Sequence, residues 1–325
     1  MEREDEKLRS MLQKKLGNYY LLKENYQVSL LKYSENYTWL IEDEAGKKVL
    51  RQCRPGYHTR EELESELSWI ACLGEQTDIK MPRIIPDKEG KFLCEINGYV
   101  CTMFSFLEGS TLRGIEGKTL EKYLFEIGKI AAVLHNQVQQ WKEAGDLSRF
   151  TWDFEDLIGE KARVGDWKAH PGLTKDEREI FEKAVPIIKK RLENYGKSPD
   201  RYGLIHSDLN INNVIVNGEI VQILDFDDCG FGWFLYDLST SVLEYDVGIE
   251  DKINAWIRGY ETVRMLSDED KAMIPTFIVM RKIVRIGWIA SHIENDTVKK
   301  VAADYYSQTA LMAEKYVETR GEVFI

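Results

Sequence analysis

The chain has 325 residues, of which 43% are hydrophobic and 30% are charged. This length allows about two domains with substantial cores, and the composition excludes a disordered chain, a collagen-like repeat and a disulfide-dense miniature scaffold. With 44 Lys and Arg against 55 Asp and Glu, the net charge is −11, which disfavours broad nucleic-acid or anionic-membrane surfaces because both would repel the protein. We expect small molecules, cationic groups or other proteins as partners, no nucleic acid and no membrane; no oligomeric state is indicated.

The pattern of the first residues predicts no secretion signal. Residues 1–7 are almost all charged and no apolar run follows them, so we expect a cytoplasmic protein. The apolar stretch at 276–293 contains Arg281, Lys282 and Arg285, which predicts a buried helix and not a membrane span. The five cysteines include no C-x-x-C pair, so we expect reduced and mostly buried thiols.

Strand patterns occupy most of the first hundred residues. Aromatic and β-branched residues between turn signals predict strands at 26–32, 37–42 and 47–51. A helix is expected to follow Thr59, because acidic residues fill its first turn and apolar residues then recur at helical spacing. An Asn-Gly pair at 97–98 between two further strand patterns predicts a hairpin.

The apolar spacing in the remainder of the chain predicts mostly helices. Turn residues at 108–110 indicate a linker, so we place the border between a strand-rich part, 1–108, and a helical part, 109–325. Apolar residues at intervals of three and four predict five helices, at 120–140, 175–195, 251–265, 268–292 and 298–319.

Polar side chains gather around a predicted hairpin within 202–226. Its two short apolar strands are joined by an Asn-Gly turn at 217–218, so the hairpin should bring Asp208, Asn213 and Asp225 to one end. Carboxylate and amide oxygens suit Mg²⁺. The pattern H-x-D-x-x-x-x-N, followed 17 residues (225 − 208) after its Asp by a second Asp, is typical of kinase-like enzymes. There the first Asp accepts the hydroxyl proton, and the Asn and second Asp hold the metal.

These motifs resemble those of a known family. His206-Ser207-Asp208 with Asn213, the run at 223–228 and the run at 234–238 resemble the aminoglycoside phosphotransferase and choline kinase family, especially the branch with stress-response kinase A, homoserine kinase type II and hydroxylysine kinase. The likeness is strong over 204–239 and weaker over most of the chain. It implies an α+β, bilobal, protein-kinase-like fold: an N-terminal nucleotide-binding lobe, 1–108, and a larger helical lobe, 109–325, with the catalytic loop and acceptor pocket.

The resemblance also implies roles around the predicted hairpin, with ATP and Mg²⁺ as cofactors. It assigns Asp208 as the catalytic base, and Asn213 and Asp225 as magnesium ligands. His206 is implied to support the loop backbone, and Asp237 is implied to be a structural anchor. For Asp227 and Asp228, assistance to the metal and a solvated turn both stay open.

Further implied roles concern the nucleotide. Arg51 resembles the basic residue that touches the phosphates, and Glu66 resembles the helix glutamate that orients it, with Glu62 as the alternative one turn earlier. Ser105 and Leu107 resemble hinge residues whose backbone meets adenine.

Two departures from the family pattern affect nucleotide binding. Position 51 is Arg where protein kinases use Lys, and a guanidinium can also grip phosphate. The turn at 34–37 contains no glycine, so polar side chains and backbone N–H groups must cover the nucleotide there, with Asn36 as the expected contact.

The expected activity is ATP- and Mg²⁺-dependent transfer of the γ-phosphoryl group to a hydroxyl of an amino sugar, amino acid or amino alcohol. The alternatives are a stress-response-type Ser/Thr protein kinase and an inactive nucleotide-binding pseudokinase. Only 12 residues (237 − 225) separate Asp225 from Asp237, which leaves no extended activation loop and favours small acceptors.

Arg281 and Arg285 share a helix face and either reach an anionic group or form internal ion pairs. The remaining histidines, 58, 135, 170 and 292, lack metal-ligand spacing, and we interpret them as structural or exposed.

Overall fold

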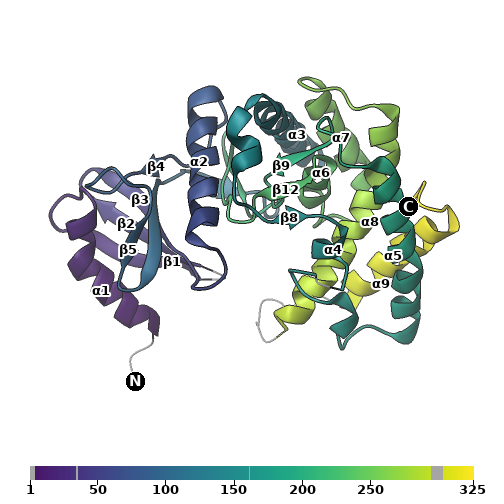
Figure 1. Ribbon diagram of the computed structural model, residues 1–325, viewed down its shortest axis with the longest axis horizontal. Coiled ribbons are helices and arrows are strands. Elements are labelled where there is room, and N and C mark those ends of the chain that lie inside the picture. Colours follow the sequence, from purple (N-terminus) through teal and green to yellow (C-terminus); the bar gives the residue numbers. More distant parts are fainter. Residues whose placement is uncertain (1–3, 34–35, 161, 294–302) are drawn as a thin grey trace. The chain divides into compact units, whose positions relative to one another are not determined.

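The computed structural model describes residues 4–33, 36–160, 162–293 and 303–325, and Figure 1 shows their ribbon. The chain divides into two compact units. Unit 1 consists of Met1–Thr111, Gly145–Arg149 and Ile215–Asp227, and unit 2 consists of Leu112–Ala144, Phe150–Val214 and Asp228–Ile325. The expected border after residue 108 lies three residues (111 − 108) before the end of the first segment of unit 1.

Two later segments group with unit 1, whereas the sequence pattern placed them in the helical part. They are Gly145–Arg149 and Ile215–Asp227. The second segment joins unit 1 because strand β10 (Val214–Asn217) pairs both with β11 (Ile220–Ile223) and with β7 (Ser110–Thr111). Strand pairing between residues a hundred positions apart leaves no local sequence signal.

Unit 1 is built around an antiparallel sheet with the strand order β1-β2-β3-β6-β4, and β5 pairs with β6. These strands are β1 (Gln27–Tyr33), β2 (Tyr37–Asp43), β3 (Gly46–Gln52), β4 (Ile84–Ile85), β5 (Cys94–Ile96) and β6 (Tyr99–Ser105). The strands predicted before residue 105 are therefore confirmed. Asn97 (φ 56°) and Gly98 (φ 81°) connect β5 to β6 in the left-handed conformation that a type I′ hairpin turn requires.

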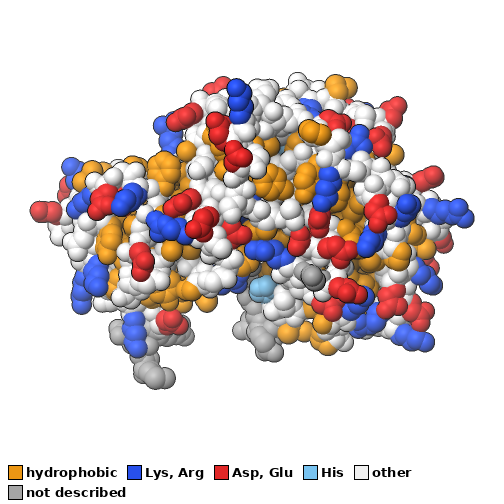
Figure 2. Space-filling view, viewed as in Figure 1, with side chains coloured by type: hydrophobic (Ala, Val, Ile, Leu, Met, Phe, Trp, Pro, Cys, Tyr) orange, Lys and Arg blue, Asp and Glu red, His pale blue; other side chains and the backbone are white. Residues whose placement is uncertain are grey.

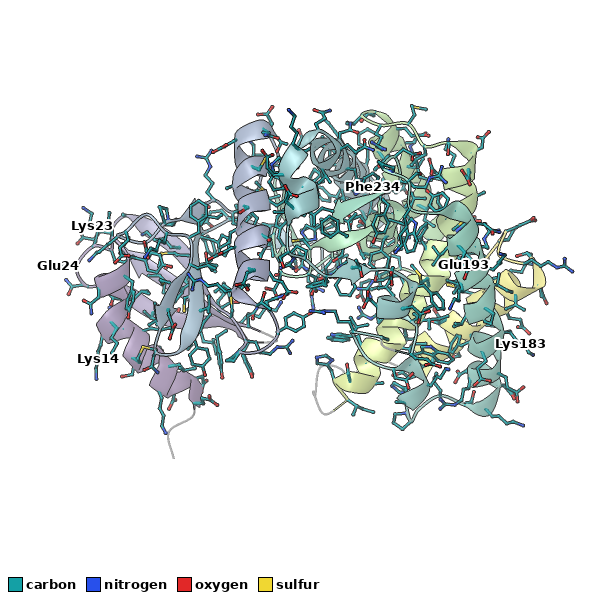
Figure 3. The ribbon with its side chains drawn as sticks, in the orientation of Figure 1. Lys14, Lys23, Glu24, Lys183, Glu193 and Phe234 are labelled. Carbon is teal, nitrogen blue, oxygen red and sulfur yellow. The ribbon has the colours of Figure 1, made fainter. Side chains whose placement is uncertain are left out.

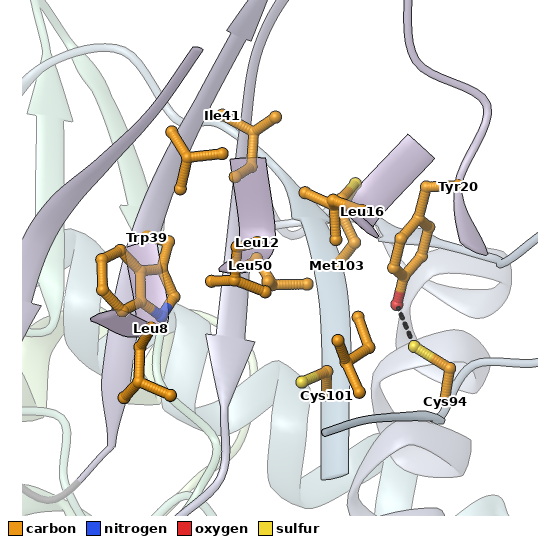
Figure 4. Close-up of a cluster of buried hydrophobic side chains, with 12 residues drawn as sticks. Leu8, Leu12, Leu16, Tyr20, Trp39, Ile41, Leu50, Cys94, Cys101 and Met103 are labelled. Carbon is orange, nitrogen blue, oxygen red and sulfur yellow. Dashed lines mark hydrogen bonds between the residues drawn. The ribbon is translucent and has the colours of Figure 1, made fainter. Parts of the chain in front are cut away.

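Among its described residues, unit 1 contains two α-helices. The predicted helix α2 (Arg60–Gln76) begins after a capping box in which Thr59 and Glu62 bond to each other's backbone N–H groups. Helix α1 (Glu4–Tyr19) was not predicted, because its charged residues obscure a narrow apolar stripe of Leu8, Leu12 and Leu16. Figure 4 shows this stripe in one hydrophobic cluster with side chains of the sheet.

The turn of the predicted hairpin lies one residue later than expected. Asn217 is the last residue of β10, and Gly218 (φ 61°) and Glu219 form the turn, as in a type II′ hairpin with glycine first. The expected linker at 108–110 also differs, since Ser110 already pairs with Val216. A Cβ on Gly109 would lie 2.4 Å from the Val216 carbonyl oxygen, so only glycine allows this approach.

Unit 2 is mainly helical and contains a three-stranded sheet with the order β8-β12-β9. Its strands are β8 (Thr151–Trp152), β9 (Tyr202–Ile205) and β12 (Gly230–Trp233). Its helices are α3 (Gly117–Gln140), α4 (Phe154–Leu157), α5 (Lys175–Tyr195), α6 (Leu235–Ser241), α7 (Ile249–Glu261), α8 (Asp268–Ser291) and α9 (Ala303–Glu318), with 3-10 turns η1 (Lys142–Asp146) and η2 (Trp167–Ala169).

The five predicted helices correspond to α3, α5, α7, α8 and α9. Helix α5 has the predicted bounds, and a capping box of Thr174 and Glu177 begins it. Figure 3 shows Lys183 and Glu193 pointing away from α5. Helix α7 ends at Glu261, four residues (265 − 261) before the predicted end. The predicted first residues of the last helix, 298–302, lie outside the described residues.

Helices α3 and α7 pack with their backbones in close approach at two glycines. A Cβ on Gly259 would lie 1.8 Å from the Phe125 carbonyl oxygen, and one on Gly128 would lie 2.1 Å from that of Trp256. We expect Gly259→Ala to lower the free energy of unfolding by about 3 kcal/mol or more, because backbone must move apart. Chemical denaturation measures this loss.

Gly145→Ala is the matched control for this substitution. A Cβ there meets no atom within 4 Å, and its φ is not in the left-handed range. Equal denaturation midpoints for the two variants would contradict the close packing of α3 on α7.

The distribution of surface charges and the burial of the cysteines agree with the expectations from composition. On the face shown in Figure 2, acidic and basic side chains are interspersed. All five cysteines are free thiols, and four of them are buried, as predicted. Within the described ranges, no helix has the length and apolar character needed to cross a membrane.

Candidate active site

Asp208 lies in the loop between β9 and β10, in unit 2. Its carboxylate accepts hydrogen bonds from two amides: Oδ1 from Asn210 Nδ2 (2.7 Å) and Oδ2 from Asn213 Nδ2 (2.6 Å). The preceding residue, Ser207, has φ 64°, a left-handed conformation that is uncommon outside glycine. The Asp208 side chain stays 23% exposed, so its carboxylate is fixed in direction yet open to a ligand.

Asp237 anchors the backbone of this loop. It lies in the first turn of α6, is fully buried, and accepts hydrogen bonds from the backbone N–H groups of Ser207 (2.7 Å) and His206 (3.2 Å). His135 Nε2 is a third partner, at 3.1 Å from Asp237 Oδ2. Burial lowers the pKa of His135, so its neutral ring donates from Nε2 and accepts from the Tyr260 hydroxyl at Nδ1.

His206 is buried, and its Nδ1 accepts a hydrogen bond from the Asp208 backbone N–H (3.3 Å). The Ser207 hydroxyl donates to the Asp228 carbonyl oxygen (2.5 Å), which also accepts from Trp152 Nε1 (2.7 Å). These contacts fix the Asp208 loop on both sides. Figure 3 labels Phe234, whose ring stacks on His135 with centroids 4.4 Å apart and so closes this buried cluster.

Asn213 has one chemically consistent amide orientation. Its Nδ2 lies 3.1 Å from the Asp208 carbonyl oxygen and 2.6 Å from the Asp208 carboxylate, and both of these atoms are acceptors. The amide nitrogen must therefore face Asp208, which leaves Oδ1 to accept other bonds or a metal.

Asp225 follows β11 and belongs to unit 1, whereas Asp208 and Asn213 belong to unit 2. Its φ of 69° is again left-handed, as in Ser207. The structure brings Asp208 and Asn213 together, and the expected convergence of Asp225 with them stays a prediction.

Arg51 and Glu66 form a two-pronged ion pair inside unit 1. Arg51 Nη1 and Nη2 donate to Glu66 Oε1 (2.7 Å) and Oε2 (2.8 Å), and both side chains are buried. Glu62, the alternative partner, instead caps α2 and lies 3.4 Å from His58 Nδ1. Of these two glutamates, Glu66 is the one that bonds to the Arg51 side chain, and its role toward a nucleotide stays a prediction.

Asp227 is a buried anion of unit 1, and neither role left open for it, assistance to the metal or a solvated turn, anticipates its partners there. Its carboxylate lies 3.3 Å from Arg51 Nη1 and 3.5 Å from His58 Nε2, and its carbonyl oxygen accepts from Arg149 Nη2 (2.5 Å). Burial alone would raise the pKa of Asp227, but the bond from His58 and the charges of Arg51 and Arg149 hold it well below the usual range.

The residues expected to contact the nucleotide at Asn36, Ser105 and Leu107 differ in which of their polar groups are already hydrogen-bonded. The Asn36 amide donates to Asp227 (3.1 Å) and accepts from the Arg54 backbone N–H (2.8 Å), so this side chain is committed inside unit 1. Ser105 exchanges hydrogen bonds with the Arg83 backbone. The backbone N–H and C=O of Leu107 bond to no other described residue, so they are available to a ligand.

Sequence reasoning missed several residues of these clusters. His58 and Arg149 meet Asp227 across long chain separations, which no motif marks. Asn210 stands two residues after Asp208, and its spacing was a usable signal for a bond to that carboxylate. Arg281 and Arg285 do form ion pairs, with Asp208 (3.6 Å) and Glu244 (2.6 Å) respectively.

Comparison with known proteins identifies the family. The model of the phosphotransferase enzyme family, APH, matches residues 30–266, which is more than half of the chain. The chain belongs to this family. It is a kinase with the α+β, protein-kinase-like fold, so the fold class and the enzyme class expected from the sequence are confirmed.

Individual relatives agree with this assignment. A solved structure of a microcompartment-associated aminopropanol kinase is 32% identical, covers 97% of this chain and 99% of its own, and superposes with a TM-score of 0.87. The amicoumacin kinase of Bacillus subtilis is 22% identical over 84% of this chain and 82% of its own length. A homoserine kinase of Rhizobium rhizogenes is 29% identical over 61% of this chain and 60% of its own length.

Proposed function

We propose that this kinase transfers the γ-phosphoryl group of ATP, with Mg²⁺, to a hydroxyl of a small molecule of the amino sugar, amino acid or amino alcohol type. The names of its relatives support a small acceptor, since they include aminopropanol, amicoumacin and homoserine kinases. An amicoumacin kinase with the same fold has been solved with AMP-PNP and Ca²⁺, which supports a nucleoside triphosphate and a divalent cation.

The observation that carries the proposal is the fixed, partly exposed carboxylate of Asp208. Two amides hold its direction, and the Asp237-anchored backbone holds its position, so a bound hydroxyl meets a preorganised acceptor. Asp208 takes the hydroxyl proton as the acceptor oxygen bonds to the γ-phosphorus. The bond from that phosphorus to the β–γ bridging oxygen breaks, and ADP leaves with the electron pair.

Asn213 and Asp225 fit a magnesium ion by the chemistry of their donors. Asn213 has Oδ1 turned away from Asp208, and Asp225 offers a carboxylate; hard oxygen ligands of this kind, completed by phosphate oxygens, suit Mg²⁺. When bound, the metal neutralises charge on the β- and γ-phosphates.

Unit 1 supplies the proposed nucleotide contacts. Arg51, oriented by Glu66 and Asp227, is the phosphate-binding cation, and the free backbone groups of Leu107 meet the base. For Asn36 we propose that the backbone, and not the side chain, contacts the nucleotide, because the side-chain amide is already bonded to Asp227 and Arg54. Ser105, two positions before Leu107, is proposed as the second hinge residue that meets the base.

The test of the proposed function is ADP release from MgATP across a panel of hydroxylated amines, amino acids and amino sugars. Acceptor-dependent release, with a phosphorylated product of matching mass, supports the proposal. Binding of nucleotide with no release across the panel would favour the pseudokinase alternative. Autophosphorylation that Asp208→Ala abolishes, without small-molecule turnover, would favour the protein kinase.

Asp225→Asn tests the metal assignment separately. We expect the dissociation constant for MgATP to rise about 10- to 100-fold, because the metal loses a charged ligand, while binding of metal-free ATP changes little. Isothermal titration with and without Mg²⁺ measures both. Asp251→Asn, at an exposed position on α7, is the control. Equal MgATP affinity in the two variants would show that Asp225 does not bind the metal.

A further inference from the structure

Arg281 projects from α8 to the candidate base. Its Nη2 lies 3.6 Å from Asp208 Oδ1, within ion-pair range but beyond hydrogen-bond distance, and its side chain is only 14% exposed. Within the described ranges, Arg281 makes no hydrogen bond, and its buried Nε has no acceptor. Of the five N–H donors of the guanidinium, only the Nε–H is enclosed without an acceptor, and the Nη groups keep some access to solvent and hence to a ligand.

Such an arrangement is costly unless a ligand completes it. Removing most of a guanidinium from water is unfavourable, and an ion pair beyond hydrogen-bond distance together with the Tyr236 ring, 5.8 Å away, offsets only part of that cost. The planar donor set of Arg matches a carboxylate or phosphate in two-pronged geometry. Arg281 thus has the chemistry of an anion-binding residue beside the reacting hydroxyl.

Arg285 is a second guanidinium on the same face of α8. It stands four residues later, about 6 Å further along the helix axis. It pairs with Glu244 at 2.6 Å, and its buried Nε also lacks an acceptor among the described residues. The Tyr305 ring lies 5.9 Å from its guanidinium. Glu244 offsets the charge of Arg285 at close range, so of these two residues Arg281 is the one whose described anion lies beyond hydrogen-bond distance.

We propose that Arg281, with Arg285 beside it, binds a carboxylate of the phosphoryl acceptor, so that the acceptor is a hydroxy acid or hydroxy amino acid and not a simple amino alcohol. The inference rests on the proposed function, because it takes Asp208 as the group that meets the acceptor hydroxyl. A carboxylate is favoured over the transferred phosphoryl group as the ligand of Arg281, because the proposed function already gives that phosphoryl group the metal and Arg51 as partners.

Matched acceptor pairs that differ only by a carboxylate test the proposal. They are threonine and 1-amino-2-propanol, serine and ethanolamine, and homoserine and 3-amino-1-propanol. Binding is measured by titration calorimetry on the full chain with AMP-PNP and Mg²⁺. We expect at least one carboxylate-bearing member to bind about 10- to 100-fold more tightly than its partner.

Substitutions then assign that preference to Arg281. Arg281→Gln should abolish the preference, and Arg281→Lys, which keeps the charge but loses the planar donors, should retain part of it. The exposed Arg258→Gln on α7 should bind like wild type. A preference that survives in Arg281→Gln, or the absence of any preference in all three pairs, overturns the proposal.

Phosphoryl transfer to the same pairs separates this inference from the proposed function. Transfer to amino alcohols with no preference for the carboxylate leaves the kinase assignment intact and overturns the acceptor class. Equal slowing of both members of a pair by Arg281→Gln also overturns it, because Arg281 would then act on Asp208 or on the transferred group. Failure of the proposed function itself would appear as no transfer to any acceptor of the wider panel.

Discussion

Replacing Asp208 with asparagine is expected to lower the rate of phosphoryl transfer by about 10²- to 10⁴-fold, the usual contribution of a positioned general base. Asparagine has nearly the same shape but cannot take the hydroxyl proton. Nucleotide affinity should change little, because Asp208 is not assigned to the metal or to the phosphates. Single-turnover rates at saturating MgATP and acceptor, together with nucleotide titration, measure the two quantities.

Asp200→Asn provides the matched control in unit 2. This carboxylate is 65% exposed and lies 3.6 Å from Arg201, at a distance typical of a weak surface ion pair. Its loss should leave the transfer rate at the wild-type value. A wild-type rate in Asp208→Asn would contradict the assignment of Asp208 as the base.

Asp227→Asn is expected to destabilise the protein by about 3–5 kcal/mol, the range for breaking a buried ion pair by removing one partner. Asp227 is 5% exposed, and its loss removes the anion that faces both Arg51 and His58, while Glu66 still pairs with Arg51. Urea denaturation at neutral pH measures the change. A wild-type midpoint would show that the Asp227 charge is dispensable for the stability of unit 1.

The same residue predicts a pH dependence with a defined sign. The pKa of Asp227 is held below its ordinary value by His58, Arg51 and Arg149, so below about pH 4 the unfolded chain binds this proton more readily than the folded one. The stabilising contribution is complete above the unfolded pKa and is lost as the pH falls through the folded pKa. The difference between wild type and Asp227→Asn should therefore shrink in acid.

Denaturation midpoints of both proteins between neutral pH and pH 3 follow this difference. Asp251→Asn, an exposed carboxylate on α7, is the control and should run parallel to wild type at every pH. A difference between wild type and Asp227→Asn that stays constant down to pH 3 would contradict the depressed pKa of Asp227.

Local signals in the sequence predicted much of the fold. The acidic first turn after Thr59 marks the start of α2, apolar residues at helical spacing mark α5, and the Asn97-Gly98 pair marks the β5–β6 turn. Helix α1 was missed because only three leucines face the core among many charges. The two-residue strand β8 was missed because it depends on pairing with β12, which no local pattern records.

The candidate site likewise contains local contacts that the sequence predicts and long-range contacts that it does not. Asp208 and Asn213 are five residues apart, so a motif captures their contact. Asp227 meets His58 across 169 positions (227 − 58), and Asp208 meets Arg281 across 73 (281 − 208). Such contacts depend on the folded chain, and only the acidic run around Asp227 and the basic pair on α8 hinted at them.

The most direct test of the central claim is a crystal structure of this kinase with AMP-PNP and Mg²⁺. The account predicts a metal ion held by Asn213 Oδ1, the Asp225 carboxylate and phosphate oxygens, with Asp208 outside the metal's ligands and directed at the γ-phosphoryl group. A metal–nucleotide complex that touches neither Asn213 nor Asp225, or one in which Asp208 is itself a metal ligand, would contradict it.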